Sequence, residues 1–479
     1  MAKLKNIIMQ LSDADYQAIY DSLSTGGADK SAYLLKSMRE SYSGDHTLMN
    51  ELEVNTNAYY TLRSRLNQKI EEYLLQQMEN PRTDILKKVA NINEILFTKK
   101  KAIAIATLKK LEKELIDYDL SNELTVVYKA LKKLHHNTEE YFQYSQLYNK
   151  HVAYMLAVDK AEDLLSSYFI KFGNYSLTGD SVNKLELELL NKEMANICRL
   201  YDSHRLYIYK NCMNVYHRLF VEEDESNADL EPIEDILNKA EEIFALYSLD
   251  SIYFHLKLVY EFLKLEYYNH YTLYRKADNY YEEVNESCDT FLSNFTLYTY
   301  PAQFLITKIE RKKRQPEGLP LSEENQAIFQ DFEPDRDNLP QYITYVTYRA
   351  LSCYFDNKFD EAAKWFNNLL NDVSLKKYQN SQLEIKTLLA LQYCLVKDYE
   401  LFNQLINSIQ RQIRILGKDN CVNIQLLNKI MKISLSESKR NKREKIGEMA
   451  KVFNSLKPEQ HFSPTLLINI NDELINKLV

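Results

Sequence analysis

The sequence predicts an all-α protein, built as a stack of antiparallel helix pairs behind an N-terminal cap of three helices. Two observations predict this class. The chain has only 8 glycines in 479 residues, and glycine is what tight hairpins and phosphate-binding loops need for positive backbone dihedrals. Apolar residues also recur every three to four positions along most of the chain, which is the period of an amphipathic helix. We therefore expect at least about two-thirds helix, against roughly one-third in an average globular protein.

The N-terminal segment, residues 1–80, is expected to form three helices. The first begins after Ser12, where acidic residues favour a helix N-terminus, and ends at Gly26-Gly27. The second covers about residues 30–40. The third stops before Pro81 and carries apolar residues at helical spacing: Tyr59, Leu62, Leu66, Ile70, Tyr73 and Leu74.

Residues 81–220 are expected to form a region of helical hairpins. We expect one long helix over about residues 84–117, whose exposed face carries the lysines 99–101. Later helices are expected at about residues 122–135, 138–157, 159–172, 181–200 and 204–220, with a loop at 173–179. His135-His136 lies close to Glu139 and Glu140, a pattern that metal ions can use. Because this pair falls at an expected turn and no third ligand can be named, we expect no metal site.

The second half of the chain contains an internal repeat, expected over residues 232–310 and 342–479. Ala240 and Ala277 stand in similar contexts, a step of 37 residues, and Phe402 follows Ala362 by 40. Steps of this size are typical of helix-pair repeats.

A segment rich in proline and charge, residues 311–341, interrupts this repeat. It holds four of the nine prolines: Pro316, Pro320, Pro334 and Pro340. Because proline removes a backbone donor and long loops are usually functional or disordered, we expect an irregular and mobile insertion.

Residues 345–371 carry the sharpest repeat unit. Ala350 is a small residue where two helices must approach closely, and Phe359, Ala362 and Phe366 alternate aromatic with small side chains. This unit resembles a tetratricopeptide repeat. The resemblance implies a superhelical stack, an α-solenoid, in which the first helix of each pair lines a concave groove.

That register gives candidate partner-binding residues on or near the groove: Phe262, Glu266, Thr347, Leu351, Tyr354 and Leu391. Partly exposed apolar groups in a concavity are usual anchors for a partner. The alternative is that Leu351 and Tyr354 are ordinary packing between helices.

Two basic clusters are candidate contacts for an anionic partner: Arg311, Lys312, Lys313, Arg314, Lys439, Arg440, Lys442 and Arg443. Lysine and arginine gathered in this way can meet phosphates. The alternative is a solvated helix end and loop.

Composition restricts the function classes. The net charge of −8 gives no overall drive toward nucleic acid or an anionic membrane. The metalloprotease, phosphate-loop and nucleophile-elbow motifs are absent from the sequence, so we expect no enzymatic activity and no cofactor. The six scattered cysteines are expected to be reduced core residues. With no apolar run long enough for a signal peptide or a membrane span, we expect a cytoplasmic protein.

Our main hypothesis is a non-enzymatic scaffold or adaptor that holds a partner protein or peptide in a concave helical groove. Two alternatives stay open. In the first, residues 1–80 form a helix-turn-helix whose Arg63 and Arg65 face DNA, and the repeats sense a peptide. In the second, the chain is a structural subunit of a larger assembly.

Overall fold

The computed structural model confirms the all-α class. It describes residues 4, 7–8, 11, 13–40, 45–77, 81–118, 120–201, 203–222, 230–248, 250–315, 320–329, 332, 334–435, 441–456 and 464–479. Helices make up 84% of the structure, and the described residues include no strand. Within the same residues, no helix combines the length and apolar character that crossing a bilayer requires. The chain divides into two compact units, residues 1–152 and 153–479, which we describe separately.

The first unit begins with a bundle that has its own core between residues 4 and 73. Its helices are α2 (Asp13–Thr25), α3 (Asp29–Glu40), α4 (Asp45–Glu51) and α5 (Thr56–Gln77). Helices α2, α3 and α5 correspond to the three that the sequence predicts, and α4 is an additional short helix. The α5 stripe is buried at Tyr59, Leu66 and Ile70. Ser12, the expected first cap, lies outside the described residues.

The long helix expected over residues 84–117 is wrong. The structure has three helices there, α6 (Pro81–Ala90), α7 (Ile92–Thr98) and α8 (Lys101–Asp117), which pack with α9 (Ser121–Leu134). The physical reason is burial. In one straight helix Ile85 and Leu115 would lie about 45 Å apart at 1.5 Å per residue, whereas the turns bring both side chains into a single core.

Helix α10 (Glu140–Thr178) is one continuous helix, so the expected break near residue 158 and the loop at 173–179 are also wrong. Gly173 suggested a loop, but its role is close packing. A Cβ atom at this position would lie 3.1 Å from Pro340 Cβ and 3.1 Å from Tyr300 Cε2. Because such contacts are too tight, only glycine lets the helix approach these side chains.

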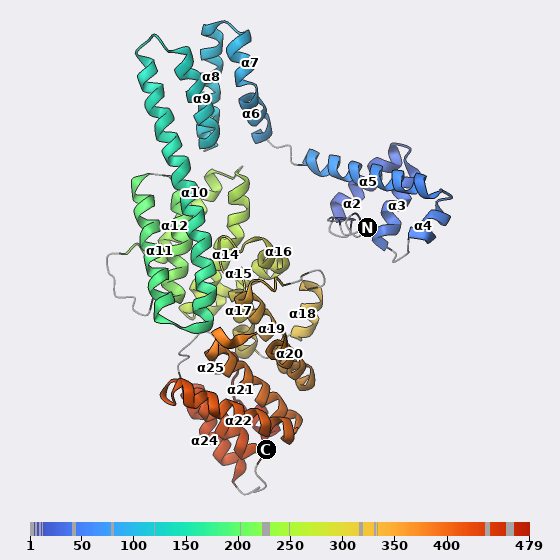
Figure 1. The fold of residues 1–479 in the computed structure, drawn as a ribbon, viewed down its shortest axis with the longest axis vertical. Helices are drawn as coiled ribbons and strands as arrows, with labels where there is room; N and C mark the ends of the chain where they lie inside the picture. Colours follow the sequence, from blue (N-terminus) through green and yellow to red (C-terminus); the bar gives the residue numbers. More distant parts are fainter. Residues whose placement is uncertain are drawn as a thin grey trace. The chain divides into compact units, whose positions relative to one another are not determined.

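The second unit continues with helices that are mostly paired with their neighbours in the chain (Figure 1). They are α11 (Ser181–Leu200), α12 (His204–Phe220), α13 (Ile233–Leu246), α14 (Ser251–His270), α15 (Tyr274–Glu286), α16 (Cys288–Asn294), α17 (Gln303–Arg314), α18 (Leu321–Ile328), α19 (Leu339–Phe355), α20 (Phe359–Asp372), α21 (Gln379–Val396), α22 (Tyr399–Leu416), α23 (Val422–Leu435), α24 (Lys442–Ser455), α25 (Pro464–Leu467) and α26 (Asp472–Leu478). Two short 3-10 helices lie at Leu375–Lys377 and Asp419–Cys421.

Sequential pairing organises the core of this unit. Helices α13, α14 and α15 pack in chain order, as do α19 to α22, and one continuous hydrophobic core joins them. The chain also returns on itself, because α25 packs against α17 and α23. All six cysteines carry free thiols, and five of them are buried.

The pair α19 and α20 gives a direct test of helix packing. Ala362 on α20 and Ala350 on α19 are both fully buried. We expect Ala362→Leu to lower the free energy of unfolding by about 1–3 kcal/mol, because the added methyl groups overfill the contact. Urea unfolding followed by the fluorescence of the single tryptophan, Trp365, measures this. The control Ala245→Leu, on an exposed position of α13, should stay within about 0.5 kcal/mol, and equal effects of both variants would contradict the pairing.

Candidate interaction site

The predicted groove residues are all buried. Phe262, Glu266, Thr347, Leu351, Tyr354 and Leu391 have at most 7% of their surface exposed. The expected partial exposure is therefore wrong, because neighbouring helices cover the first helices on several sides: α14 packs with α12, α13 and α15, and α19 packs with α17, α18 and α20. Leu351 and Tyr354 are packing residues, which is the alternative that the sequence left open.

Glu266 is the chemically unusual member of this set. Its carboxyl group is buried on α14 and accepts a hydrogen bond of 2.5 Å from the Thr307 hydroxyl on α17. Burial raises the pKa of Glu266 to about 8, an effect that the Thr307 hydrogen bond partly offsets. The group is therefore mostly protonated at neutral pH.

The basic run Arg311–Arg314 continues α17 and does not form a loop. Arg311 lies 3.5 Å from carboxylate oxygens of both Asp278 and Glu282 on α15. Its guanidinium also stacks 3.9 Å from the centre of the Tyr281 ring. These contacts join α17 to α15, so Arg311 is committed to the fold.

The other side chains of this run are also engaged. The Arg314 guanidinium lies 3.6 Å from the centre of the Tyr274 ring. The Lys313 ammonium donates hydrogen bonds to the backbone oxygens of Thr465 at 3.2 Å and Leu466 at 2.7 Å. Lys312 has an interaction partner as well. The side chains of this run are partly exposed and are engaged by other parts of the chain, so they do not form a free cluster, and contact with an anionic partner stays a prediction.

The second basic cluster is only partly described. Lys439 and Arg440 lie outside the described residues. Lys442 is buried and donates a hydrogen bond of 2.7 Å to the backbone oxygen of Ser434. Arg443 is exposed. Lys442 is therefore a structural contact, and the two described side chains do not form a common surface.

The insertion at residues 311–341 is more ordered than the sequence predicts. It contains α18 (Leu321–Ile328), flanked by residues 316–319, 330, 331 and 333, which lie outside the description. Helix α18 packs on α19, and its two apolar ends, Leu321 and Phe329, are buried. The expectation of an irregular segment is wrong for this helix, and its mobility stays a prediction.

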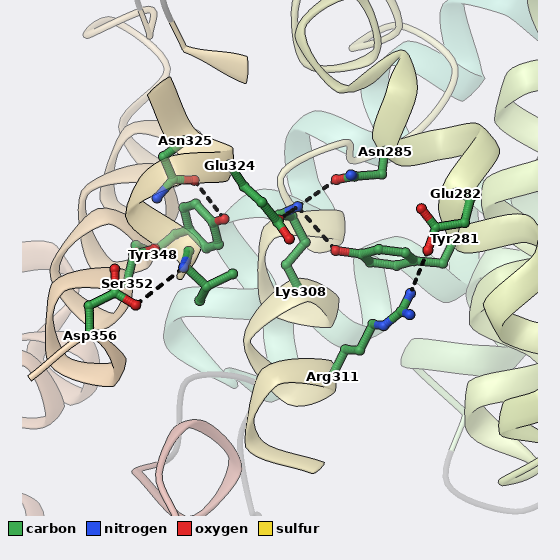
Figure 2. A network of polar contacts seen from close by, with 11 residues as sticks. Tyr281, Glu282, Asn285, Lys308, Arg311, Glu324, Asn325, Tyr348, Ser352 and Asp356 are labelled. Atoms are coloured by element: carbon green, nitrogen blue, oxygen red, sulfur yellow. Dashed lines mark hydrogen bonds and ion pairs between the residues drawn. The ribbon is translucent and has the colours of Figure 1, made fainter. Parts of the chain in front are cut away.

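A buried polar network holds α18 in place, with Lys308 of α17 at its centre (Figure 2). The Lys308 side chain is fully buried. Its ammonium group donates hydrogen bonds to Glu324 of α18 at 2.8 Å, to the Tyr281 hydroxyl at 3.1 Å, and to the Asn285 side-chain oxygen. Burial by itself lowers the pKa of Lys308, but Tyr348, Tyr281 and Glu324 raise it above the usual value. The lysine therefore stays charged inside the protein.

Two further contacts connect α18 to α19 in the same view (Figure 2). The Tyr348 hydroxyl donates a hydrogen bond of 2.8 Å to the side-chain oxygen of Asn325. The backbone N–H of Leu321 donates one of 3.2 Å to the Asp356 carboxylate, which satisfies a free donor at the N-terminus of α18. Lys308 and Tyr348 therefore bind an acidic and an amide side chain at consecutive positions of α18.

Aromatic contacts seat the far end of α18. The Phe329 ring meets the Tyr345 ring edge-on at 5.2 Å, and the Arg349 guanidinium lies 5.3 Å from its centre. Together, α17 and α19 thus offer a surface that binds a short helix by apolar ends and a polar middle, while α15 holds Lys308 in place. We call this surface the α18 groove.

Sequence reasoning missed the α18 groove, although one signal was present. Lys308 follows Leu305 by three positions and Phe304 by four, so it lies on the apolar face of its helix. A lysine on such a face is buried only when acidic or polar partners surround it. That reasoning finds Lys308 but gives no means of choosing Glu324 as its partner.

The remaining sequence candidates lie in the first unit, and a role in DNA binding stays a prediction. Arg63 lies 5.8 Å from the Tyr59 ring, and Arg65 is close to Lys69, which pairs with Glu72 at 2.9 Å. The charge there is mixed. His135 contacts Thr138 at 3.2 Å and lies 3.8 Å from Glu140. Among the described residues, no group of three or more histidine, cysteine or acidic side chains is arranged to hold a metal ion.

Comparison of the chain with family models, with curated proteins and with solved structures gave no match.

Proposed function

We propose that this protein is a non-enzymatic scaffold, a superhelical stack of helix pairs that binds a helical segment of a partner protein in the α18 groove. One observation carries the proposal. The groove already holds a short helix through side chains that read its chemistry, with Lys308 on Glu324 and Tyr348 on Asn325. A partner helix with the same pattern of groups can replace α18.

The length of α18 supports exchange. It has 8 residues, and isolated helices shorter than about 12 residues are marginal in water because nucleation is unfavourable. Its helical state therefore depends on the groove. A longer helix from a partner begins with more intrinsic stability and loses less conformational entropy on docking.

The contacts made by α18 define which partner helices the α18 groove selects. An apolar residue must fill the place of Leu321, a Glu-Asn pair the places of Glu324 and Asn325, and an aromatic residue the place of Phe329. A buried lysine discriminates strongly, because a helix without the carboxylate leaves the Lys308 charge with fewer partners.

A synthetic peptide of residues 319–332 tests the proposal. The receptor is the full chain with Glu324→Ala and Asn325→Ala, which weakens its own α18 while Tyr281 and Asn285 still hold Lys308. We expect micromolar binding by fluorescence anisotropy. Adding Lys308→Met to the receptor should weaken binding at least about tenfold, since a hydrogen bond to a charged group contributes about 1.5–3 kcal/mol.

The matched control is the same peptide with Glu324→Lys, which should bind at least about tenfold more weakly to the receptor that keeps Lys308. If the receptor is folded by circular dichroism and the native peptide does not bind, the groove does not accept a helix from outside and the proposal fails.

A further inference from the structure

The turn between α7 and α8 exposes an aromatic side chain among lysines. Phe97 is 88% exposed and Ile103 is 53% exposed, one on each side of the turn. Between them, Lys99 and Lys100 have extended backbone conformations and, like Lys101, are exposed. The break between α7 and α8 creates this turn. In one continuous helix, the three lysines would instead be distributed around the circumference of the helix.

A second exposed aromatic residue lies at the same end of this bundle. Helices α8 and α9 are antiparallel neighbours, so the α9–α10 turn lies beside the α7–α8 turn (Figure 1). Phe142, in the first turn of α10, is 70% exposed. The α9–α10 turn carries both signs of charge, because Lys132 and Lys133 end α9 and Glu139 and Glu140 follow. Residues 95–111, around the α7–α8 turn, contain five lysines and no acidic residue.

Local charge separates this region from the rest of the chain. Residues 81–152 contain 13 Lys and Arg against 9 Asp and Glu, a net charge of +4, whereas the whole chain carries −8. The negative charge of the whole chain gives no drive toward anionic surfaces, but the local charge of this region favours them.

We propose that the α7–α8 turn binds the surface of a bilayer that contains anionic lipids. Phe97 and Ile103 insert among the acyl chains near the headgroups, and Lys99, Lys100 and Lys101 meet the lipid phosphates. An amphipathic surface of this kind is held by buried apolar area together with attraction to anionic lipids. Each lysine close to such a surface contributes about fivefold to the partition coefficient.

The shape and chemistry favour a bilayer over a folded protein partner. The apolar groups stand on a convex turn, which a deformable interface can surround without a matching cavity. Lysine ammoniums are hydrated point charges that need no fixed partner geometry, in contrast to the bidentate contacts of arginine. Nucleic acid also offers phosphates, but it gives Ile103 nothing to insert into.

Vesicle sedimentation of the full chain tests this inference. We expect binding to vesicles of phosphatidylcholine with about one-third phosphatidylserine, and at least tenfold weaker binding to phosphatidylcholine alone. Lys99→Gln/Lys100→Gln/Lys101→Gln should reduce partition at least about tenfold, given the contribution of each lysine. Phe97→Ser should reduce it by about tenfold through loss of apolar insertion.

Matched controls remove equal charge or an equally exposed ring elsewhere. They are Lys364→Gln/Lys376→Gln/Lys377→Gln and Phe254→Ser, all at exposed positions of the second unit, and both should leave binding unchanged. Equal losses in the controls, equal binding to both vesicle types, or no vesicle binding would overturn the proposal. A different outcome would assign the turn to nucleic acid and would also overturn the proposal. In that outcome the wild-type chain shifts RNA in a gel and does not bind vesicles, and the triple lysine variant of the turn no longer shifts RNA.

Discussion

Replacing Lys308 by Met is expected to lower the free energy of unfolding of the second unit by about 2–4 kcal/mol. The lysine makes hydrogen bonds to Glu324, Tyr281 and Asn285, and all three lose their partner. The Glu324 side chain is 27% exposed and regains water, whereas the Tyr281 side chain is buried and regains much less. Urea unfolding followed by Trp365 fluorescence reports this transition.

A double-mutant cycle isolates the ion pair. In a Glu324→Gln background, Lys308→Met should have a smaller effect by about 1–2 kcal/mol, because the charged partner is already absent. Lys257→Met, at an exposed lysine of α14, should change stability by less than about 0.5 kcal/mol. A Lys308→Met variant as stable as the wild type would show that the network does not contribute to holding the fold.

Replacing Glu266 by Gln is expected to stabilise the protein at alkaline pH and to have little effect in acid. The folded pKa of about 8 lies above the usual value of 4.5. Stability from this group is therefore fully present below pH 4.5, and it is lost as the pH rises toward 8, because the unfolded chain releases the proton first. With 1.36 kcal/mol per pKa unit, the rise of the pKa from 4.5 to about 8 corresponds to about 5 kcal/mol, which is the upper limit of the gain at pH 9.

The contacts around Glu266 support this direction of the pH dependence. Thr307 donates a hydrogen bond that a glutamine oxygen can also accept, and the charge of Glu310 acts in the same direction as burial. Urea unfolding of both proteins between pH 5 and 9 measures the difference, and Glu242→Gln, at an exposed position of α13, is the control. A difference between wild type and Glu266→Gln that does not grow with pH would contradict a buried, protonated carboxyl group.

The helical class was predictable because it depends on local period and glycine content, which are visible in any window of the sequence. The ends of helices were not. Residues 84–117 carry no proline or glycine, so local preference favours one helix, and the breaks arise because Ile85 and Leu115 must share a core with α9. At Gly173 the error is the opposite one, because the sequence predicts a loop where the helix continues. Glycine is needed there because a side chain would clash with Pro340, which is distant in the sequence.

The same distinction between local pattern and long-range packing explains which site residues were predictable. Periodicity identified Leu351 and Leu391 as apolar positions of their helices, and both are buried. Whether an apolar face forms an open groove or a core depends on which other helices cover it, and that is a property of the whole unit. Lys308 was detectable as a lysine on an apolar face, but its pairing with Glu324 required the folded chain.

Hydrogen exchange of the α18 amides tests most directly whether this helix can leave its groove. The account predicts that residues 321–328 exchange at least about tenfold faster than the amides of α17 and α19, through local opening that leaves both helices folded. Glu324→Ala/Asn325→Ala should accelerate exchange in α18 further and leave α17 and α19 unchanged. If the α18 amides exchange only at the rate of the neighbouring helices in both proteins, α18 is a fixed part of the core, and the groove is not available to a partner.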